Sequence, residues 1–594
     1  MLERALSVAV ESALAAGAHL RADFHRPGGA RGAGDKADAD TEAEREIRSR
    51  LMAAFPRFGY RGEETGVQAG EPGQPVWLVD PNDGTRDYLA GRRGSAVSIG
   101  LVEDGRPVLG VVFAFAYPDD AGDLFAWAEG TGPLRRNARP VATGLPGRLA
   151  ATDVVLVSSK GDLDPQGNLR NAAPARYRSL ASIAHRLAVV AAGEAAAAAS
   201  LYAPCAWDYG AGDALVRAAG GSVLDESGRP VAYDGTGDSR SRRVMGGAPA
   251  VAALLSARSW DVETGAWGTE RPARLRRGEA VADSARLARA QGCLLGQVAG
   301  DSLGALVEFQ SADAVQRSYP DGPRQLVDGG RWNLLAGQPT DDSEMALALA
   351  RSIDATGAYD PRRAFEAYQR WGASAPFDVG RTVSAALQGR PDDASQANGS
   401  LMRASPLGIL AHGLRPRDAA ELGRVESALT HPHPVCGDAV AAFVVAVGHA
   451  IANGDGGEAA HAAALQWARQ APASSSVREA LEAAATSAPR CDGASQGWVL
   501  IALQNAFYEL RHAGTVEEGL ARTVLRGGDT DTNAAIAGAL LGAVHGREGL
   551  PAQWRSMILS CHPVAGVAAR PRPMAYWPVD AMELAERLLL AGEH

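Results

Sequence analysis

The chain has 594 residues, which is too long for one hydrophobic core, so we expect at least two domains. Hydrophobic residues make up 46% and charged residues 22% of the sequence, as in a folded globular protein. The net charge of -10 and the lack of a long basic run do not favour non-specific binding to a nucleic-acid backbone, although they leave room for a local basic groove.

The five cysteines are scattered and form no CxxC pair, which argues against a disulfide framework or a zinc ribbon and favours a reducing compartment. The first stretch of the chain carries Glu3, Arg4 and Glu11, so it predicts an amphipathic helix rather than a secretory signal. No uncharged run reaches the roughly 18 to 20 residues that a membrane span needs. We therefore expect a cytoplasmic protein without membrane association.

The first part of the chain opens with helical patterns and continues with apolar runs of the length of β-strands. These runs are residues 76–80 (VWLVD), 96–104, 107–117 and 154–159. Residues 103–107 have the turn chemistry of a hairpin, residues 180–199 predict a helix, and residues 221–233 predict a strand, a turn and a second strand. This mixture predicts a layered α/β domain over residues 1–265.

The character of the sequence changes in the second half. Residues 266–283 are polar and rich in arginine, and we interpret them as a linker. From Leu287 onward, helical periodicity rich in Ala and Leu dominates, broken by Gly, Pro and Asn-Gly turns. Residues 284–594 are therefore predicted to form a second domain that is nearly all α-helix.

Acidic residues gather in three segments of the first domain. They are Glu63 in GEET, Asp80 and Asp83 in DPNDGT, and Asp208 in WDYGAGD. Two carboxylates crowded at the end of a strand repel each other unless a cation neutralises them, and oxygen-only ligands favour Mg²⁺ over zinc. Each segment also has a simpler interpretation, as a turn, a solvated surface pair or a helix cap. Their joint occurrence, directly after an apolar strand, favours a metal site.

The segments GEE, WLVDPNDGT and WDYGAGDALVRAAGG resemble the signature runs of the inositol monophosphatase superfamily, over about residues 1–258. The resemblance implies an αβαβα sandwich and a phosphatase that uses two or three Mg²⁺ ions. By the same resemblance, the metal ligands would be Glu63, Asp80, Asn82 (through its backbone carbonyl), Asp83 and Asp208. Glu63 and Thr85 would orient the attacking water, and Asp40 would lie near the metals. Gly84 and Thr85 would offer backbone N–H groups to the phosphate.

The substrate of this phosphatase-like part is less well defined. Members of the superfamily that cleave inositol phosphates carry an acidic residue seven positions before the WD aspartate, where this chain has Leu201. The family's Arg-Ser-x-Gly stretch reads RSLA at residues 178–181. These departures favour nucleotide-type substrates, such as 3′-phosphoadenosine 5′-phosphate or dinucleotide phosphates, over myo-inositol phosphate.

Two acidic segments precede predicted helices in the second domain, PTDDSE at residues 339–344 and GGDTDT at residues 527–532. Capping and the helix macrodipole favour such residues at helix N-termini, and for either segment alone capping is the simpler interpretation. Each run carries more carboxyl and hydroxyl groups than one cap requires, so we predict that the two helix starts converge on a pair of Mg²⁺ ions. The predicted ligands are Thr340, Asp341, Asp342, Asp529, Asp531 and Thr532.

Six blocks in order resemble the ADP-ribosylglycohydrolase family over about residues 284–594. They are GCLLGQVAGDSLGALVEF, TDDSEMALALA, FDVGRTVSAAL, NGSLMRASPLG, THPHPVCGDAVAAF and GGDTDTNAAIAGALLGA. The resemblance implies cleavage at the anomeric carbon of an ADP-ribosyl group. It places Glu308 at the metal site, as a gate or acid/base group, and Asp378 against the reacting ribose, and either carboxylate would take the proton of the attacking water.

The same resemblance implies a substrate pocket lined by Asn398, Gly399, Ser400, Arg403 and His431. Two of these residues keep a second interpretation. His431 also suits a packed or turn histidine, and Arg403 also suits a partner of a structural carboxylate.

Together the two constellations predict a bifunctional Mg²⁺-dependent hydrolase. Its partners would be a small phosphorylated molecule and an ADP-ribosylated protein, nucleic-acid end or free metabolite. Two alternatives from other classes remain open: one half is a degenerate binding module, such as an ADP-ribose reader, or the metal sites serve stability in a scaffold. The acidic positions are filled in both halves, which favours the enzyme.

Overall fold

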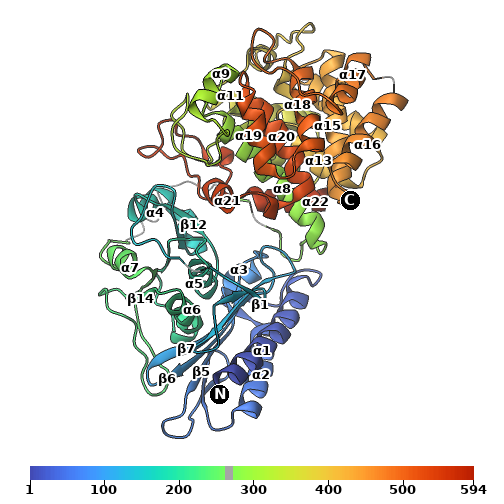
Figure 1. Cartoon of the computed structure of the whole chain (residues 1–594). Coiled ribbons are helices and arrows are strands. Elements are labelled where there is room, and N and C mark those ends of the chain that lie inside the picture. The colour runs from blue at the N-terminus through green and yellow to red at the C-terminus, as the bar shows by residue number, and fades with distance from the viewer. Residues whose placement is uncertain (143, 261–271, 274, 472, 594) are drawn as a thin grey trace. The chain divides into compact units, whose positions relative to one another are not determined.

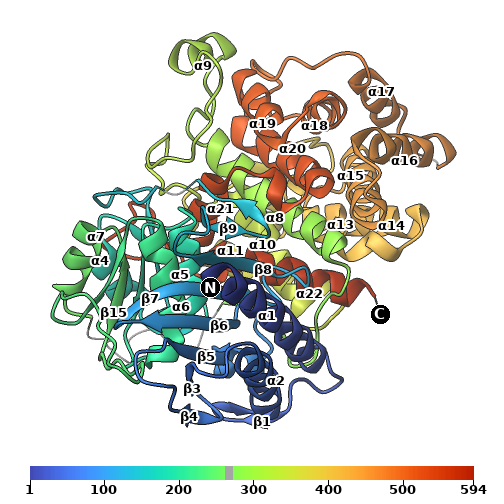
Figure 2. The ribbon, with the colours of Figure 1, turned by 60° about the horizontal axis from the view of Figure 1, so that its bottom comes forward.

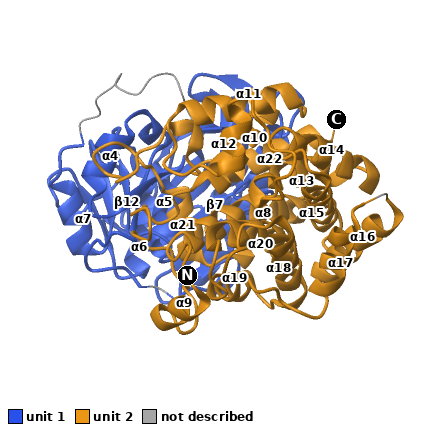
Figure 3. Cartoon of the chain, turned by 90° about the horizontal axis from the view of Figure 1, so that it is seen from above, with its two compact units in different colours: residues 1–282 blue, residues 283–594 orange. Residues whose placement is uncertain are grey.

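The computed structural model describes residues 1–142, 144–260, 272–273, 275–471 and 473–593. The chain divides into two compact units, Met1–Ala282 and Asp283–His594 (Figure 3). Of the predicted linker 266–283, residues 266–271 and 274 lie outside the described residues. Leu275 and Val281 are buried and belong to the first unit.

The first unit is built of five alternating layers (Figures 1 and 2). Helices α1 (Leu2–Phe24) and α2 (Asp38–Ala54) cover one face of an eight-stranded sheet. Helices α5 (Ile183–Ala191) and α6 (Ala206–Ala218) lie between this sheet and a five-stranded one, whose outer side carries α4 and α7. The bounds of these last two helices are Pro165–Ala172 and Pro249–Ser256. The predicted layered α/β fold is therefore confirmed.

The larger sheet has the strand order β10-β9-β8-β7-β6-β5-β3-β4. Its strands are β3 (Gly59–Gly62), β4 (Gly66–Gln68), β5 (Val76–Asp83), β6 (Ala96–Glu103), β7 (Arg106–Ala114), β8 (Asp123–Ala128), β9 (Arg135–Arg136) and β10 (Arg139–Pro140). The smaller sheet has the order β12-β11-β13-β15-β14. Its strands are β11 (Val154–Val157), β12 (Arg176–Ser179), β13 (Ala197–Ser200), β14 (Ser222–Asp225) and β15 (Val244–Gly247). A short ribbon of β1 (Gly32–Ala33) and β2 (Lys36–Ala37) and the helix α3 (Thr85–Leu89) complete the unit with the 3₁₀ turn η1 (Ser159–Leu163).

The hairpin predicted at residues 103–107 joins β6 to β7. Glu103 pairs with Arg106 across the sheet, so Asp104 and Gly105 form a two-residue turn. Both turn residues have positive φ, 50° and 70°, as a type I′ turn requires. The prediction is confirmed.

The helix predicted over residues 180–199 is wrong at its C-terminal end. Helix α5 ends at Ala191, and the alanine run that follows enters β13. Alanine favours helices, yet β13 pairs with β11 on one side and β15 on the other, so sheet pairing outweighs the local propensity. The second strand predicted within residues 221–233 is also absent, because only an isolated bridge joins Leu224 to Pro230 and the strand that pairs with β14 is β15.

The second unit is helical throughout its described residues, as predicted. Its longer helices are α8 (Ser284–Gly304), α10 (Asp341–Asp354), α11 (Pro361–Ala373), α14 (Pro416–Ala428), α15 (Pro434–Asn453), α16 (Gly457–Gln470), α18 (Val499–His512), α20 (Thr530–His545) and α22 (Ala581–Gly592). The shorter ones are α9 (Ala312–Ser318), α12 (Arg381–Leu387), α13 (Ser405–Leu410), α17 (Ser475–Ala484), α19 (Val516–Leu525) and α21 (Ala552–Leu559). Four 3₁₀ turns complete it: η2 (Asn398–Ser400), η3 (Ala411–Gly413), η4 (Arg547–Gly549) and η5 (Met574–Tyr576).

A ridge of glycines on α8 brings it against the backbone of α20. A Cβ atom at Gly296 would lie 2.1 Å from the carbonyl oxygen of Gly538, and one at Gly300 would lie 2.0 Å from that of Ala534. Only glycine allows two helix backbones to approach so closely. The ridge continues to Gly304, where a Cβ would lie 2.4 Å from the Cα atom of Asp531. The end of α8 is thereby placed beside the start of α20.

Within the described residues, one helix, α15, is long and apolar enough to span a membrane by length and composition. Its apolar stretch is 83% buried inside the structure. Its Asp438 accepts a hydrogen bond from Arg424 at 2.9 Å. These contacts are those of a core helix.

Two candidate metal-binding active sites

The first site forms where strand β5 bulges. Asp80 lies opposite Ser98 and Asp83 lies opposite Ala96, so three steps along β5 match two steps along β6. In a regular strand, side chains three positions apart point to opposite faces, and the extra residue of a bulge changes this direction. Burial raises the pKa of Asp80 most, and the charges of Glu63 and Asp83 raise it further, so these carboxylates belong to one cluster.

Glu63 approaches Asp80 from the neighbouring strand. It follows β3, which runs parallel to β5, and its N–H donates to the carbonyl of Val79 at 3.1 Å. Its carboxyl group lies within hydrogen-bond reach of that of Asp80. Parallel pairing of two sequence-distant strands therefore joins the GEE and DPNDGT segments.

Asp208 reaches the same cluster from helix α6. One of its oxygens accepts the backbone N–H of Cys205 at 2.8 Å, so it caps the helix as the simpler interpretation supposed. Its charge also raises the pKa of Asp80, which places the same carboxylate in the cluster. Capping and site formation are compatible.

Asp40, Asn82 and Thr85 form a hydrogen-bonded group beside these acids. The side-chain amide of Asn82 donates to Asp40 at 2.9 Å, and the hydroxyl of Thr85 lies 3.1 Å from Asp40 and 3.0 Å from the carbonyl of Asn82. Gly84, with φ of 102°, makes the sharp turn into α3. The turn predicted at DPNDGT therefore also brings Asn82 and Thr85 into contact with Asp40.

Burial and the crowding of acids dominate the electrostatics of this site, although the buried guanidinium of Arg186 acts on Asp83. Burial, followed by repulsion from neighbouring acids, raises the pKa of Asp80 and of Asp208 well above the usual range. Burial also raises the pKa of Glu63 to about 7 and that of Asp40 to about 7. At neutral pH these groups are stable as carboxylates only beside added positive charge.

The second site forms where the starts of α10 and α20 meet. The pKa of Asp531 is raised by burial and then by the charges of Glu308 and Asp342, and that of Asp341 by burial, Asp378 and Asp301. Acids from both helix starts therefore share one buried space. Carboxylate oxygens of Glu308, Asp378 and Asp531 all lie within 4.8 Å of one another.

The remaining predicted ligands surround this group. Asp529 accepts the side-chain amide of Asn398 at 2.7 Å, and Asp341 accepts the N–H of Gly380 at 3.3 Å. Thr532 contacts the carboxylate of Asp529, which opposes the rise that burial causes in the pKa of Asp529. The hydrogen bonds hold acids that would otherwise repel one another.

Family models match both units. The ADP-ribosylglycohydrolase model matches residues 282–592, and the model named inositol monophosphatase family matches residues 1–263. The chain belongs to the ADP-ribosylglycohydrolase family in its second unit and to the inositol monophosphatase family in its first. This confirms both resemblances.

Curated relatives of each unit are similar over most of their own length. The ADP-ribosyl-(dinitrogen reductase) glycohydrolase of Rhodospirillum rubrum is 30% identical over 280 residues, 46% of this chain and 90% of the relative. An inositol-1-monophosphatase of Mesorhizobium japonicum is 36% identical over 236 residues, 38% of this chain and 86% of the relative. A solved structure titled as an ADP-ribosylglycohydrolase-related protein complex has 27% identity and a TM-score of 0.43, covering 51% of this chain and 98% of that chain.

Both families typically depend on metal ions, and the donors at both sites suit hard cations. The acids offer only oxygen atoms, and three of them in the glycohydrolase unit are close enough to share one ion. In the phosphatase unit, the buried side-chain oxygen of Asn82 has no hydrogen-bond partner within the described structure. In the glycohydrolase unit the same holds for one oxygen of Asp342. Both sites therefore fit divalent cations.

Asp301 is a site residue of the glycohydrolase unit that the sequence analysis missed. Its carboxylate accepts the N–H and the hydroxyl of Thr340, the latter at 2.9 Å, and the N–H of Ser343 at 3.1 Å. It therefore fixes the start of α10 from α8. The sequence feature that could have indicated it is the aspartate of AGDSLG, within the family-like segment GCLLGQVAGDSLGALVEF.

Glu308 has two partners that the sequence did not indicate. The indole N–H of Trp332 donates to it at 2.8 Å, and the guanidinium of Arg331 lies 3.9 Å away. The next residue, Phe309, has a φ of 62° and donates its N–H to the carbonyl of Gly528 at 2.7 Å. Such a conformation is strained for a residue with a side chain, and it turns the chain sharply after Glu308.

Glu44 organises the phosphatase unit in a similar way. Its carboxylate accepts the N–H groups of Glu64 and Thr65 at 2.7 and 2.9 Å and the hydroxyl of Thr65 at 2.5 Å. It therefore holds the loop that carries Glu63. Its position four residues after Asp40 on α2 was the available signal.

Two predicted pocket residues of the glycohydrolase unit are deeply packed. Arg403 is fully buried, pairs with Glu426 at 2.7 Å and stacks over the ring of Tyr368, which is the structural role considered as its alternative. His431 is buried, hydrogen-bonded to Thr430 at 2.8 Å, and burial lowers its pKa to about 3, so its ring is neutral.

The other pocket positions lie in one turn beside them. η2 contains Asn398, Gly399 and Ser400, all buried. A Cβ at Gly399 would lie 3.0 Å from the ring of His431, so the histidine packs on the turn. Asn398 is the one of these residues that contacts a predicted ligand, Asp529.

Proposed function

We propose that the chain is a bifunctional Mg²⁺-dependent hydrolase. The first unit would remove a phosphate monoester from a small phosphorylated metabolite of nucleotide type, and the second would hydrolyse the N- or O-glycosidic bond of an ADP-ribosyl group. The observation that carries the proposal is that each unit gathers acids from distant segments into one buried cluster. In each cluster the carboxylates outnumber the nearby cations, which are Arg186 beside Asp83 and Arg331 beside Glu308.

In the phosphatase unit, Glu63, Asp80, Asp83, Asp208 and the carbonyl of Asn82 would hold two or three Mg²⁺ ions. The ions would supply charge that stabilises the phosphoryl group and its leaving oxygen. Glu63 and Thr85 would orient the attacking water. Thr85 suits this role because Asp40 and the carbonyl of Asn82 take its proton and leave its oxygen lone pairs available.

In the glycohydrolase unit, the predicted ligands Thr340, Asp341, Asp342, Asp529, Asp531 and Thr532 would hold two Mg²⁺ ions. Glu308 or Asp378 would take the proton of the attacking water. Glu308 suits this role by position, because its carboxylate lies in the cluster with Asp378 and Asp531 and is oriented by the indole N–H of Trp332. Asn398 would position Asp529 through their hydrogen bond.

The residues of the first unit also bear on the substrate of the phosphatase. Leu201 occupies the position at which inositol-cleaving members carry an acid, and it supplies no hydrogen-bond acceptor for a cyclitol hydroxyl. The two units would act on related molecules, because one would release an ADP-ribosyl group and the other would remove a phosphate monoester from that group or from its product. We therefore favour adenine- or ribose-containing phosphates over inositol phosphate.

The test is a substrate panel on the full chain with Mg²⁺, reading phosphate release and ADP-ribose release in parallel. The phosphates are adenosine 3′,5′-bisphosphate, NADP, phosphorylated ADP-ribose and inositol 1-phosphate. The ADP-ribosylated substrates carry the group on arginine, on serine or on a nucleic-acid end. Brisk release from inositol 1-phosphate with none from any nucleotide would overturn the nucleotide assignment.

Single substitutions separate the two sites. Asp83→Asn is expected to abolish phosphate release and spare ADP-ribose release, and Asp531→Asn is expected to do the reverse. The matched controls are Asp35→Asn and Asp418→Asn, which change exposed acids of the same two units. A protein without turnover that nevertheless binds ADP-ribose would instead be a reader, and one whose melting alone responds to Mg²⁺ would be a scaffold.

A further inference from the structure

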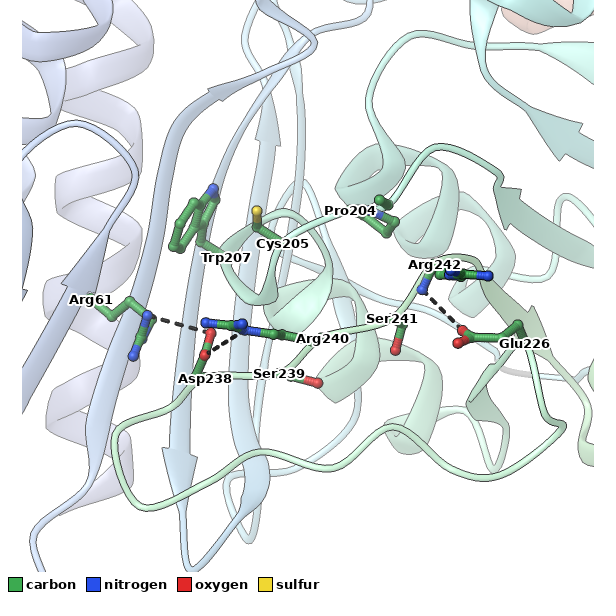
Figure 4. Close-up of a pocket in the computed structure, with 11 residues that line it drawn as sticks. Arg61, Pro204, Cys205, Trp207, Glu226, Asp238, Ser239, Arg240, Ser241 and Arg242 are labelled. Atoms are coloured by element: carbon green, nitrogen blue, oxygen red, sulfur yellow. Dashed lines mark hydrogen bonds and ion pairs between the residues drawn. The ribbon is translucent and has the colours of Figure 1, made fainter.

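A pocket of about 510 Å³ opens beside the start of α6 in the phosphatase unit (Figure 4). Its walls are Arg61 of β3, part of the segment 203–207 that leads into α6, and part of the segment 226–242 between β14 and β15. None of the lining residues belongs to the carboxylate cluster. The role of this pocket is therefore not explained by the metal site.

Backbone contacts nevertheless tie the pocket to that cluster. The N–H of Cys205 donates to Asp208, and Cys205 also forms an isolated β-bridge with Arg240. The N–H of Ala203 donates to the carbonyl of Arg242 at 2.9 Å. Arg61 stands two residues before Glu63 on the other wall. The wall of the pocket and the metal-binding acids thus share the segment around Cys205.

The charge of the pocket is opposite to that of the cluster. Its lining contains three arginines, Arg61, Arg240 and Arg242, and two acids, Asp238 and Glu226. Asp238 pairs with two of the arginines, at 3.4 Å with Arg61 and at 3.2 Å with Arg240.

Glu226 is engaged by backbone groups instead. It accepts the N–H of Arg242 at 3.0 Å, while the guanidinium of Arg242 has no partner among the described residues. Figure 4 shows Arg240 and Arg242 projecting from one extended segment, with Ser239 and Ser241 beside them. The pocket therefore offers an unused guanidinium, two serines and a positive excess next to a strongly acidic site.

Arginine guanidinium groups match phosphate oxygens in geometry as well as charge. Exposed ion pairs contribute little to stability, and the Arg240 side chain is 91% exposed, so Asp238 can release it to an incoming anion at small cost. Arg61 is held in place by Thr236, whose carbonyl and hydroxyl oxygens lie 3.1 and 2.8 Å from it. The guanidinium of Arg61 is thus held at the wall of the pocket by contacts within the protein.

We propose that this pocket binds a second phosphate group of the phosphatase substrate, so that the preferred substrate is a bisphosphate and not a simple monoester. The scissile phosphate would lie at the carboxylate cluster and the second one in the pocket that Arg240 and Arg242 line. This proposal rests on the phosphatase activity proposed above. It adds the selection for a second phosphate.

The experiment compares substrates that differ only in the second phosphate. Adenosine 3′,5′-bisphosphate is paired with adenosine 3′-monophosphate, and inositol 1,4-bisphosphate with inositol 1-phosphate. The full chain with Mg²⁺ is expected to show a KM for the bisphosphate lower by about 10-fold or more in one of the pairs, as expected for a charge-assisted contact. The pair that shows it identifies a nucleotide or a cyclitol as the carrier.

The double variant Arg240→Ala/Arg242→Ala is expected to raise that KM to the value of the monophosphate and to leave kcat unchanged. The matched control is Arg229→Ala, because Arg229 lies in the same connecting segment with 78% of its side chain exposed and outside the pocket. Calorimetric titration of the same pairs against the Asp83→Asn protein measures binding independently of turnover.

Equal KM and equal binding within both pairs, or a bisphosphate preference that survives in the double variant, would overturn the proposal. Hydrolysis of the monophosphates would still leave the phosphatase activity standing in that case. A bisphosphate preference in binding without any hydrolysis would retain the pocket and remove the phosphatase. The two failures are therefore distinguishable.

Discussion

The indole of Trp332 donates its N–H to the carboxylate of Glu308 at 2.8 Å, and that carboxylate shares a space with those of Asp378 and Asp531. One hydrogen bond from the segment between α9 and α10 thus orients an acid at the end of the first helix of the unit. Because the bond favours the charged form, it opposes the rise that burial causes in the pKa of Glu308.

Replacing this tryptophan should slow the glycohydrolase selectively. Trp332→Phe keeps an aromatic ring but removes the donor, and a lost hydrogen bond to a charged group corresponds to about a 10-fold fall in the rate of ADP-ribose release. Phosphate release should not change. Trp554→Phe is the control. Trp554 also donates its indole N–H, but to the backbone carbonyl of Arg324 at 3.0 Å and not to an acid of the site. Equal loss of both activities in Trp332→Phe would contradict the assignment.

The loop that carries Glu63 should depend on Glu44. Glu44→Gln preserves shape but exchanges a carboxylate for a neutral amide. The N–H groups of Glu64 and Thr65, which bond to different oxygens of Glu44, both lose a charged acceptor, and the one that faces the amide NH2 loses its acceptor altogether. We expect kcat for phosphate release to fall by about 10-fold, with the melting temperature lowered by a few degrees. Glu46→Gln is the control, because Glu46 lies on the same helix and pairs only with Arg50 at the surface. Unchanged phosphate release would show that the loop needs no such support.

The packing of α8 on α20 leaves no room for a methyl group. Gly296→Ala would place a Cβ 2.1 Å from the carbonyl of Gly538, so the helices must separate, and we expect a loss of about 1–3 kcal/mol in the free energy of unfolding of the second unit. Gly437→Ala on α15 is the control. Its nearest atom would be 3.6 Å away, and the added helix propensity should leave stability equal or slightly higher. Denaturant titration followed by circular dichroism measures both, and equal stability of the two variants would refute the close approach.

Stability should depend on pH in opposite ways with and without metal. The pKa values of Glu63, Asp40, Asp301 and Glu308 are each raised by burial to about 7. The folded, metal-free chain therefore binds more protons than the unfolded chain between about pH 4 and 7, and its stability falls as the pH rises through this window.

Mg²⁺ neutralises the same acids once they are deprotonated. It should therefore raise the melting temperature more at about pH 7.5 than at about pH 5.5, whereas the chelated protein should melt higher at the lower pH. Calorimetric melts in Mg²⁺ and in EDTA at the two pH values check this. A larger effect of Mg²⁺ at the lower pH would contradict buried carboxylate sites.

The sequence predicted the site best where acidic residues follow a recognisable local pattern. Asp80 and Asp83 follow an apolar strand in a turn-forming segment, so crowding of their carboxylates was foreseeable from local pattern. The role of Asp301 was not foreseeable, because this residue lies within a helix and its contacts depend on which helix packs opposite. Nothing local in a helical aspartate says that it will receive the N–H groups of Thr340 and Ser343.

The strand β13 shows the same limit in the fold. Its residues Ala197–Ser200 have helical propensity, and only the strands on either side of it, β11 and β15, decide its conformation. Local preference fails when tertiary neighbours provide the hydrogen bonds. Arg403 shows the same limit for a side chain, because its ion pair with Glu426 depends on where α14 packs.

The glycine ridge between α8 and α20 has a consequence for the geometry of the acidic site at their ends. Because main chain rests on main chain there, the acids at the two helix ends, Asp301 on α8 and Asp531 on α20, are held at a spacing set by backbone contact. Substitutions that leave the glycines in place are therefore expected to keep this spacing, whatever they do to the surrounding connections.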